Sequence, residues 1–179
     1  DKQVFDAALQ VTTPKDELLI GTVVGTKEEE GEAKARVETK QWHAAESDRK
    51  PSTMVWVNNK AGEELTTQSK YTGANYLIMG SHGKGGLKRA VLGSVSDHCV
   101  RHCEIPVMVV HRMSPLSDAE KPLNFVVALD GSELGARILE TVQDLARPQD
   151  KVTAVMVVHK EEDRADAEKT LKMITANSD

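Results

Sequence analysis

The chain lacks the features of a membrane or exported protein. It has no apolar run of about 18 residues, and no basic and apolar leader opens it, so the sequence predicts a cytoplasmic protein without membrane contact. Its net charge of −5 argues against general nucleic-acid binding. With 39% hydrophobic and 28% charged residues, we expect a soluble globular fold of one domain or slightly more.

Cysteine is scarce, and both cysteines stand in one short segment, Asp97 to Cys103. His98 and His102 are four residues apart, as are Cys99 and Cys103, which is helix spacing and differs from the Cys-x2-Cys knuckle of a zinc site. No second cluster completes four ligands, so the sequence predicts no metal site. The thiols point to a reducing compartment.

Two widespread phosphate-binding motifs are also absent. No Gly-Lys-Ser/Thr occurs in the chain, which excludes a Walker A loop. Gly83 and Gly85 match the first pair of the dinucleotide fingerprint, but Lys88 occupies its third glycine position.

A different glycine-rich segment is present, running from Gly80 to Ser94. It follows an apolar strand predicted at 75–79 and leads into a helix that Ser94 is expected to cap, with Asp97 as the return partner of a capping box. At the carboxyl end of a strand in an open α/β sheet, such a loop presents backbone N–H groups and the positive end of a helix. We therefore expect it to bind an anion.

The spacing of this segment is Gly, two residues, Gly, nine residues, Gly-Ser, carried by Gly80, Gly83, Gly93 and Ser94. It resembles the ATP-binding signature of the universal stress protein family, and the flanking Val95-Ser96-Asp97 is similar too. The resemblance implies ATP, with Mg, as ligand. It implies a nucleotide site made of Met79, Gly80, His82, Gly83, Lys84, Gly93, Ser94, Val95 and Asp130.

In that family the glycines let the backbone approach the phosphates, and Gly93 and Ser94 meet the terminal phosphates through N–H groups at the helix start. Met79 and Val95 line the pocket, and Asp130, as the opening Asp of a copy, contacts the adenine or ribose region. Lys84 is a candidate phosphate partner. An ordinary solvated surface lysine is at least as good an interpretation of Lys84.

Short apolar runs alternate with helical stripes along the chain, which predicts an α/β fold with an open parallel sheet and helices on both faces. The resemblance implies the same adenine nucleotide alpha-hydrolase-like fold with five strands. That fold opens with a strand, whereas the order predicted here opens with a helix over residues 4–9.

A strand like the one that opens this family's fold is predicted later in the chain, at 123–129, and the turn Asp130-Gly131-Ser132 follows it. An internal repeat supports this, because Pro14-Lys15-Asp16-Glu17-Leu18 matches Pro148-Gln149-Asp150-Lys151-Val152 at a shift of 134 residues. We predict a domain at 1–112 that lacks its first strand, a linker at 113–122, and the N-terminal part of a second copy at 123–179.

Two arrangements and several functions stay open at this point. The chain is either part of a tandem protein, or a permuted domain in which strand 123–129 fills the vacant central position. The leading function is an ATP-binding stress or signalling module that acts through a homodimer, a tandem pseudo-dimer or a partner protein. The alternative is a scaffold domain with a degenerate nucleotide site. No residue can be nominated for catalysis, so at most weak ATP hydrolysis is expected.

Overall fold

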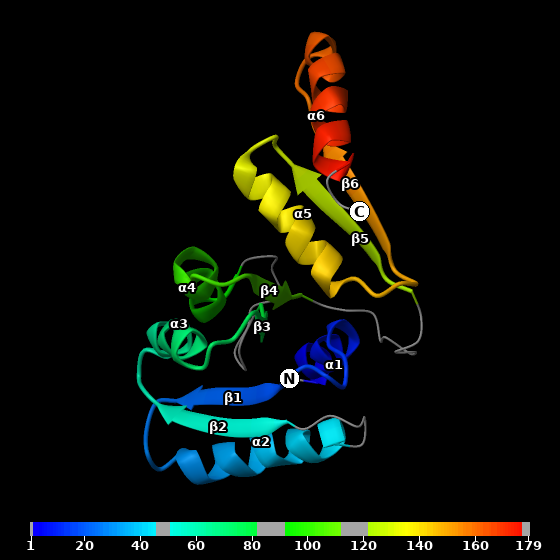
Figure 1. Cartoon of the computed structure of the whole chain (residues 1–179). Helices are drawn as coiled ribbons and strands as arrows, with labels where there is room; N and C mark the ends of the chain where they lie inside the picture. Colours follow the sequence, from blue (N-terminus) through cyan, green and yellow to red (C-terminus); the bar gives the residue numbers. More distant parts are fainter. Residues whose placement is uncertain (1, 46–50, 82–91, 112–121, 177–179) are drawn as a thin grey trace. The chain divides into compact units, whose positions relative to one another are not determined.

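The computed structural model describes residues 2–45, 51–81, 92–111 and 122–176 and divides the chain into two units, 1–119 and 120–179 (Figure 1). The division falls inside the segment that the sequence predicts as a linker. The predicted domain limits themselves stay a prediction.

Unit 1 alternates helices and strands, as the apolar periodicity predicts. Its first helix carries an apolar stripe at helical spacing and buries Ala7 and Ala8. The elements are α1 (Lys2–Val11), β1 (Leu19–Val24), α2 (Glu30–Ala45), β2 (Ser52–Val57), α3 (Ala61–Tyr71), β3 (Leu77–Gly80), α4 (Ser94–His102) and β4 (Val107–Val110).

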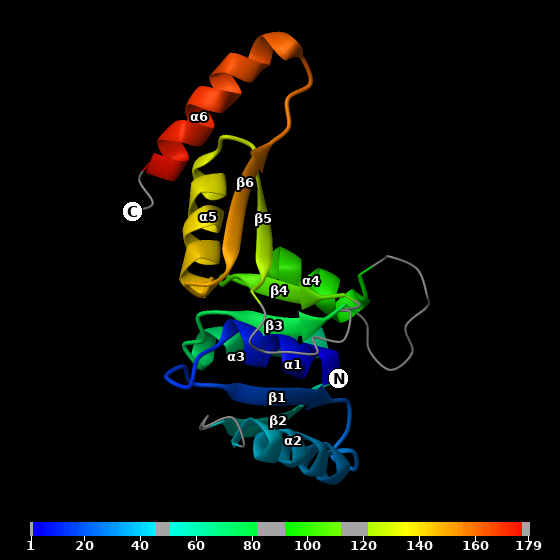
Figure 2. The same ribbon diagram turned by 90° about the vertical axis from the view of Figure 1, so that its right-hand side faces the viewer.

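The strands of unit 1 form two parallel ladders. β1 pairs with β2, with Leu19 opposite Ser52, and β3 pairs with β4, with Gly80 opposite Val110. Helix α1 contacts β3 and β4, α2 contacts β1 and β2, and α3 contacts both β1 and α4. In Figures 1 and 2, β1 is the strand of the first ladder that lies nearer to the second ladder, and β3 is the strand of the second that lies nearer to the first.

The continuous five-stranded sheet that was predicted is not seen. The described residues form three two-stranded sheets, and no ladder among them joins β1 to β3. A continuous sheet would need a further parallel strand to satisfy the inner edges of β1 and β3. The candidate for that position, β5 (Asn124–Leu129), pairs with β6 (Lys151–Met156) within unit 2. The choice between the tandem and the permuted arrangement stays a prediction.

Unit 2 contains one parallel ladder and its helices. After β5, α5 (Glu133–Leu145) crosses over to β6, and a short 3-10 turn, η1 (Glu161–Asp163), precedes α6 (Arg164–Ala176). Val127, Leu129 and Leu139 are its buried apolar residues. The side chains packed against them are Val142, Val152, Ala154, Met156, Leu171 and Ile174.

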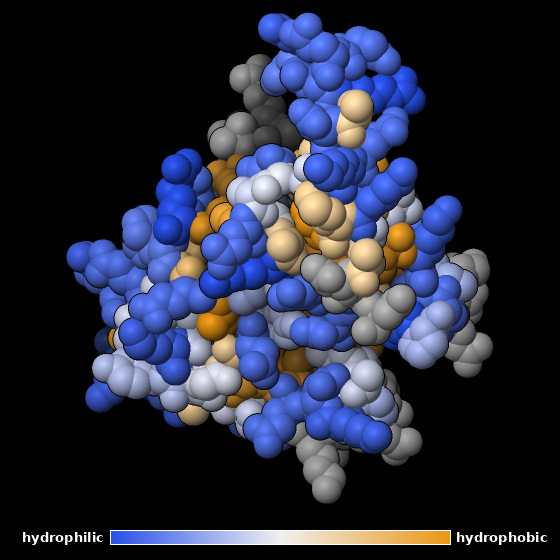
Figure 3. Space-filling model, turned by 45° about the horizontal axis from the view of Figure 1, so that its top comes forward, coloured by the Kyte–Doolittle hydropathy of each residue, from blue (hydrophilic) through white to orange (hydrophobic). Residues whose placement is uncertain are grey.

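The opposite face of this ladder is open among the described residues, because Val126 is 69% exposed. Parallel sheets are ordinarily covered on both faces, so unit 2 has a half-covered sheet. On the side that Figure 3 shows, hydrophilic residues cover most of the surface, and hydrophobic residues lie among them. No helix in the described ranges has the length and apolar character needed to cross a bilayer.

Candidate functional site

Ser81 forms the point where strand β3 leaves the sheet for the glycine-rich segment. The residue is only 6% exposed, and its N–H donates to the carbonyl of Val110 in β4 at 3.0 Å. Its own carbonyl accepts the N–H of Gly93 at 2.7 Å and the hydroxyl of Ser96 at 3.0 Å. These bonds close the neck of the loop, which we define as Ser81, Gly93 and Ser96.

The neck explains how the predicted residues on both sides of the loop come together. Met79 and Gly80 lie half-buried at the end of β3, and Gly93 lies directly before α4. Ser94 is exposed and Val95 half-buried in the first turn of that helix. The remaining loop residues of the predicted site, His82, Gly83 and Lys84, lie outside the described residues.

Helix α4 begins differently from the prediction. Gly93, and not Ser94, is its N-cap, with extended backbone and no side-chain capping bond. The carbonyl of Gly93 accepts the N–H of Asp97 at 2.9 Å and, at 2.9 Å from the Ser96 hydroxyl, shares its single O–H with the carbonyl of Ser81. The Asp97 carboxylate pairs with Arg101 at 3.0 Å, and that bond lowers the pKa of Asp97. The prediction of a capping box is therefore wrong, because the Asp97 carboxylate binds Arg101, one turn further along α4.

The start of α4 nevertheless faces the neck. The first N–H groups of a helix have no intrahelical acceptor and carry a partial positive charge. In α4, which is nine residues long, the N–H groups of Ser94 and Val95 belong to this first turn. The Gly93 N–H does not add to them, since it donates to Ser81.

His111, directly after β4, makes a polar contact that the sequence did not reveal. Its Nδ1 lies 2.8 Å from the hydroxyl oxygen of Ser81. Because Gly80 pairs with Val110 in the ladder, the next residue on each strand falls at the same edge of the sheet. One feature of the sequence could have pointed to this contact. His111 comes immediately after the apolar strand β4, which pairs with the strand that carries the loop.

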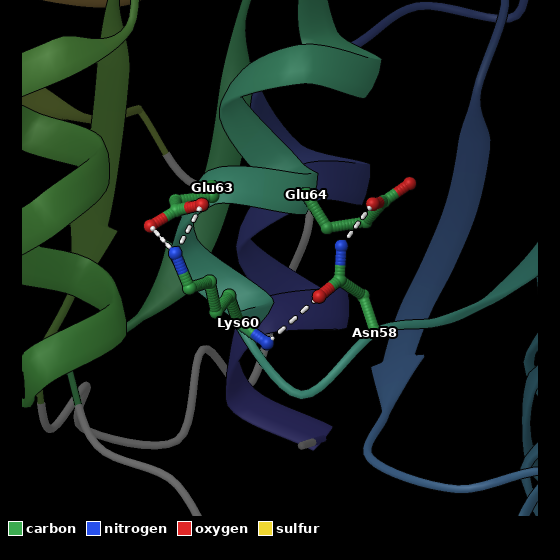
Figure 4. Close-up of polar contacts among 4 residues, drawn as sticks. All are labelled: Asn58, Lys60, Glu63 and Glu64. Atoms are coloured by element: carbon green, nitrogen blue, oxygen red, sulfur yellow. Dashed lines mark hydrogen bonds and ion pairs between the residues drawn. The ribbon is translucent and has the colours of Figure 1, made fainter.

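A second polar network, also missed from the sequence, lies between β2 and α3 (Figure 4). The Asn58 amide donates to Glu64 at 2.7 Å and accepts the N–H of Lys60 at 2.9 Å. Lys60 pairs with Glu63 at 2.9 Å. These bonds fix the entry to α3, and they use both carboxylates in holding the turn.

Asp130 is described within unit 2, whereas the loop residues belong to unit 1. Its carboxylate accepts the N–H of Ser132 at 2.9 Å, across Gly131 with its φ of 82°, and hydrogen bonds from Ser132 lower the pKa of Asp130. Ser132 in turn caps α5 by accepting the Gly135 N–H at 3.1 Å. The Asp-Gly-Ser sequence thus forms a tight strand-to-helix turn.

The histidine and cysteine cluster packs α4 against α3. Cys99 is fully buried, with its sulfur 3.9 Å from the carbonyl of Gly62, and burial raises the pKa of Cys99 to about 11. The rings of His98 and His102 stack with centroids 4.3 Å apart. Within the described ranges, no group of three or more His, Cys, Asp or Glu side chains is placed to hold a metal ion.

Comparison with known proteins gives one consistent family. The model of the universal stress protein family matches residues 4–111. Universal stress protein MJ0577 of Methanocaldococcus jannaschii is 42% identical over 50 residues, which cover 28% of this chain and 31% of that protein. Universal stress protein PHOS32 of Arabidopsis thaliana is 37% identical over 75 residues, covering 40% and 30%.

A solved structure of MJ0577 is also similar. It matches with a TM-score of 0.56 and 25% identity, over 63% of this chain and 88% of that one. The match to each of the two curated relatives, by contrast, spans less than a third of the relative's length.

Proposed function

Because the chain belongs to the universal stress protein family, we propose that unit 1 binds ATP at the Gly80–Ser94 loop and acts in signalling through nucleotide-dependent interaction. Family membership supports a role in the stress response. The observation that carries the nucleotide proposal is the closed neck, in which Ser81 accepts the Gly93 N–H at 2.7 Å.

The neck supports anion binding because it holds two features of a phosphate cradle beside each other. The end of β3 brings Gly80, where the absence of a side chain permits close backbone approach. The start of α4 brings the N–H groups of Ser94 and Val95. In this proposal Mg accompanies ATP through its phosphates, as Mg²⁺ commonly does at nucleotide sites.

The tandem arrangement is part of the same proposal, with unit 2 as the opening of a second copy. At the shift of 134 residues, Asp16 corresponds to Asp150 and Thr13 to Arg147. Each Asp carboxylate accepts the backbone N–H three residues earlier, at 2.6 Å and 2.8 Å respectively. The same local turn therefore precedes β1 and β6, and Asp130 would serve the site of the second copy.

The alternative function, a scaffold domain, is favoured by the separate ladders of unit 1. Since no described ladder joins β1 to β3, their facing edges call for completion by another segment. Either function would place the protein in the cytoplasm, which the two free thiols, Cys99 and Cys103, support.

Titration calorimetry with ATP and Mg tests the nucleotide proposal. We expect the parent chain to bind, and Gly83→Val to weaken ATP affinity by about tenfold or more, because a side chain would fill the space of the phosphates. Gly31→Val is the matched control, since a Cβ at Gly31 meets nothing within 4 Å.

If the parent chain shows no ATP binding, or if Gly83→Val binds as the parent does, the nucleotide proposal is lost and the scaffold function stands. A phosphate-release assay separates binding from turnover, and we expect release at the level of the protein-free background.

A further inference from the structure

We propose that His111 is a positioning residue of this nucleotide site, which holds Ser81 so that the neck of the loop stays closed. The inference rests on the proposed function of the loop. It concerns a residue outside the glycine signature, one that reaches the loop from the neighbouring strand.

Hydrogen bonds fix the position of Ser81. Its N–H is tied to Val110 and its carbonyl to Gly93 and Ser96, so the backbone of Ser81 joins β4 to the start of α4. Its side chain adds the bond to His111, at 2.8 Å between Oγ and Nδ1. Ser81 is thus the residue through which β3, β4 and α4 are connected.

His111 reaches Ser81 from the end of the neighbouring strand, β4. A bond between residues of the same strand would not hold the loop against a second element. The bond between His111 and Ser81 does, because it fixes the entry of the loop against the end of β4. The two residues lie at the carboxyl edge of a parallel ladder, where ligands bind in open α/β sheets.

The Ser81 hydroxyl and the His111 imidazole can form this hydrogen bond in either direction. Neutral imidazole can accept the Ser81 O–H at Nδ1, and an imidazole protonated at Nδ1 donates to the hydroxyl oxygen. An asparagine amide offers both an acceptor and a donor at a comparable distance from the backbone, whereas alanine offers neither. Asparagine at position 111 should therefore preserve the contact, and alanine should remove it.

Loss of the contact should weaken binding of the phosphates. A neutral intramolecular hydrogen bond has a modest net value, so His111→Ala should lower ATP affinity by about 3- to 10-fold. His111→Asn should restore ATP affinity to within about twofold of the parent. His159→Ala, which removes an exposed histidine of unit 2, should leave it unchanged.

A double-mutant cycle measured by calorimetry with ATP on the 1–179 chain tests the inference. If His111 acts through Ser81, then His111→Ala combined with Ser81→Ala should bind ATP no more weakly than the weaker of the two single variants. Thermal unfolding of each variant without nucleotide verifies that the comparison is made on folded protein.

The outcomes separate this inference from the function on which it rests. Absence of ATP binding by the parent overturns both. Parent-like binding by His111→Ala overturns the inference alone, as do additive effects in the cycle or failure of His111→Asn to restore affinity. A lower unfolding temperature with unchanged ATP affinity also overturns it, because His111 would then be a structural residue only.

Discussion

The same turn occurs once in each unit, and its surroundings differ. In unit 1, Asp16 is exposed and accepts the N–H and the hydroxyl of Thr13. In unit 2, the Asp150 side chain is 1% exposed and accepts two bonds from the guanidinium of Arg147. It also accepts the N–H of Leu123 at 2.7 Å, directly before β5.

The difference shows what the opening strand adds to a local motif. In unit 2, the N–H of Leu123, directly before β5, donates to the carboxylate, and the turn becomes a buried clasp between the start of β5 and the start of β6. In unit 1, no described strand other than β2 pairs with β1. One sequence pattern is therefore an exposed turn in one unit and a buried tie in the other.

The largest expected effect comes from removing the buried carboxylate. Asp150→Ala should lower the free energy of unfolding of unit 2 by about 3 kcal/mol, because it removes the carboxylate that accepts from the Arg147 guanidinium and from the Leu123 N–H. This is the low end for a buried pair, since Arg147 keeps 19% exposure. Hydrogen exchange of the β5 and β6 amides measures the effect.

Asp16→Ala is the matched variant for unit 1 and should cost about 1 kcal/mol or less, because its bonds are exposed. Both tryptophans, Trp42 and Trp56, belong to unit 1, so their fluorescence during urea unfolding reports on that unit. Equal losses for the two aspartate variants would remove the distinction between turn and clasp.

An intermediate effect is expected at Gly21, which corresponds to Val155 at the shift of 134 residues. A Cβ at Gly21 would overlap the ring of Trp56 on the neighbouring strand. Gly21→Ala should therefore lower the stability of unit 1 by about 1–3 kcal/mol and shift the tryptophan emission. Gly31→Ala, in open space, should not destabilise the unit, and parental stability of Gly21→Ala would contradict the packing described here.

The smallest effect is the part of the acid dependence of unit 2 that comes from Asp150. Hydrogen bonds from Arg147 lower the pKa of Asp150, so its contribution is complete above the unfolded-state pKa of about 4 and is lost as pH falls below that value. The loss should not exceed about 1.4 kcal/mol per pH unit. Protection factors of unit 2 amides, corrected for the intrinsic exchange rate at each pH, should fall more steeply between pH 4 and 3 in the parent than in Asp150→Asn, and identical slopes would contradict the assignment.

The sequence predicted the order of helices and strands well, because apolar periodicity is a local property. The stripe at residues 4–9 lies within α1, and the strand predicted at 75–79 overlaps β3, which runs from Leu77 to Gly80. It also predicted the family through glycine spacing. The role of each site residue stays a prediction, and His82, Gly83 and Lys84 lie outside the described residues.

The sequence did not predict contacts between distant residues or the choice among competing local bonds. Ser81 and His111 are 30 positions apart, and only the β3–β4 register brings them together. The cap of α4 was misassigned because Gly93 is held by Ser81, and Asp97 had an alternative partner in Arg101.

By itself, the sequence determined the α/β alternation, the glycine signature and the similarity of residues 14–18 to residues 148–152, all of which follow from side-chain type and spacing along the chain. Only the tertiary structure decided that the ladders of unit 1 remain separate, that Ser81 closes the neck of the loop, and that Asp150 is buried where Asp16 is exposed. The reason is that pairing and burial depend on which strands lie beside one another, and periodicity carries no information about neighbours across the sheet.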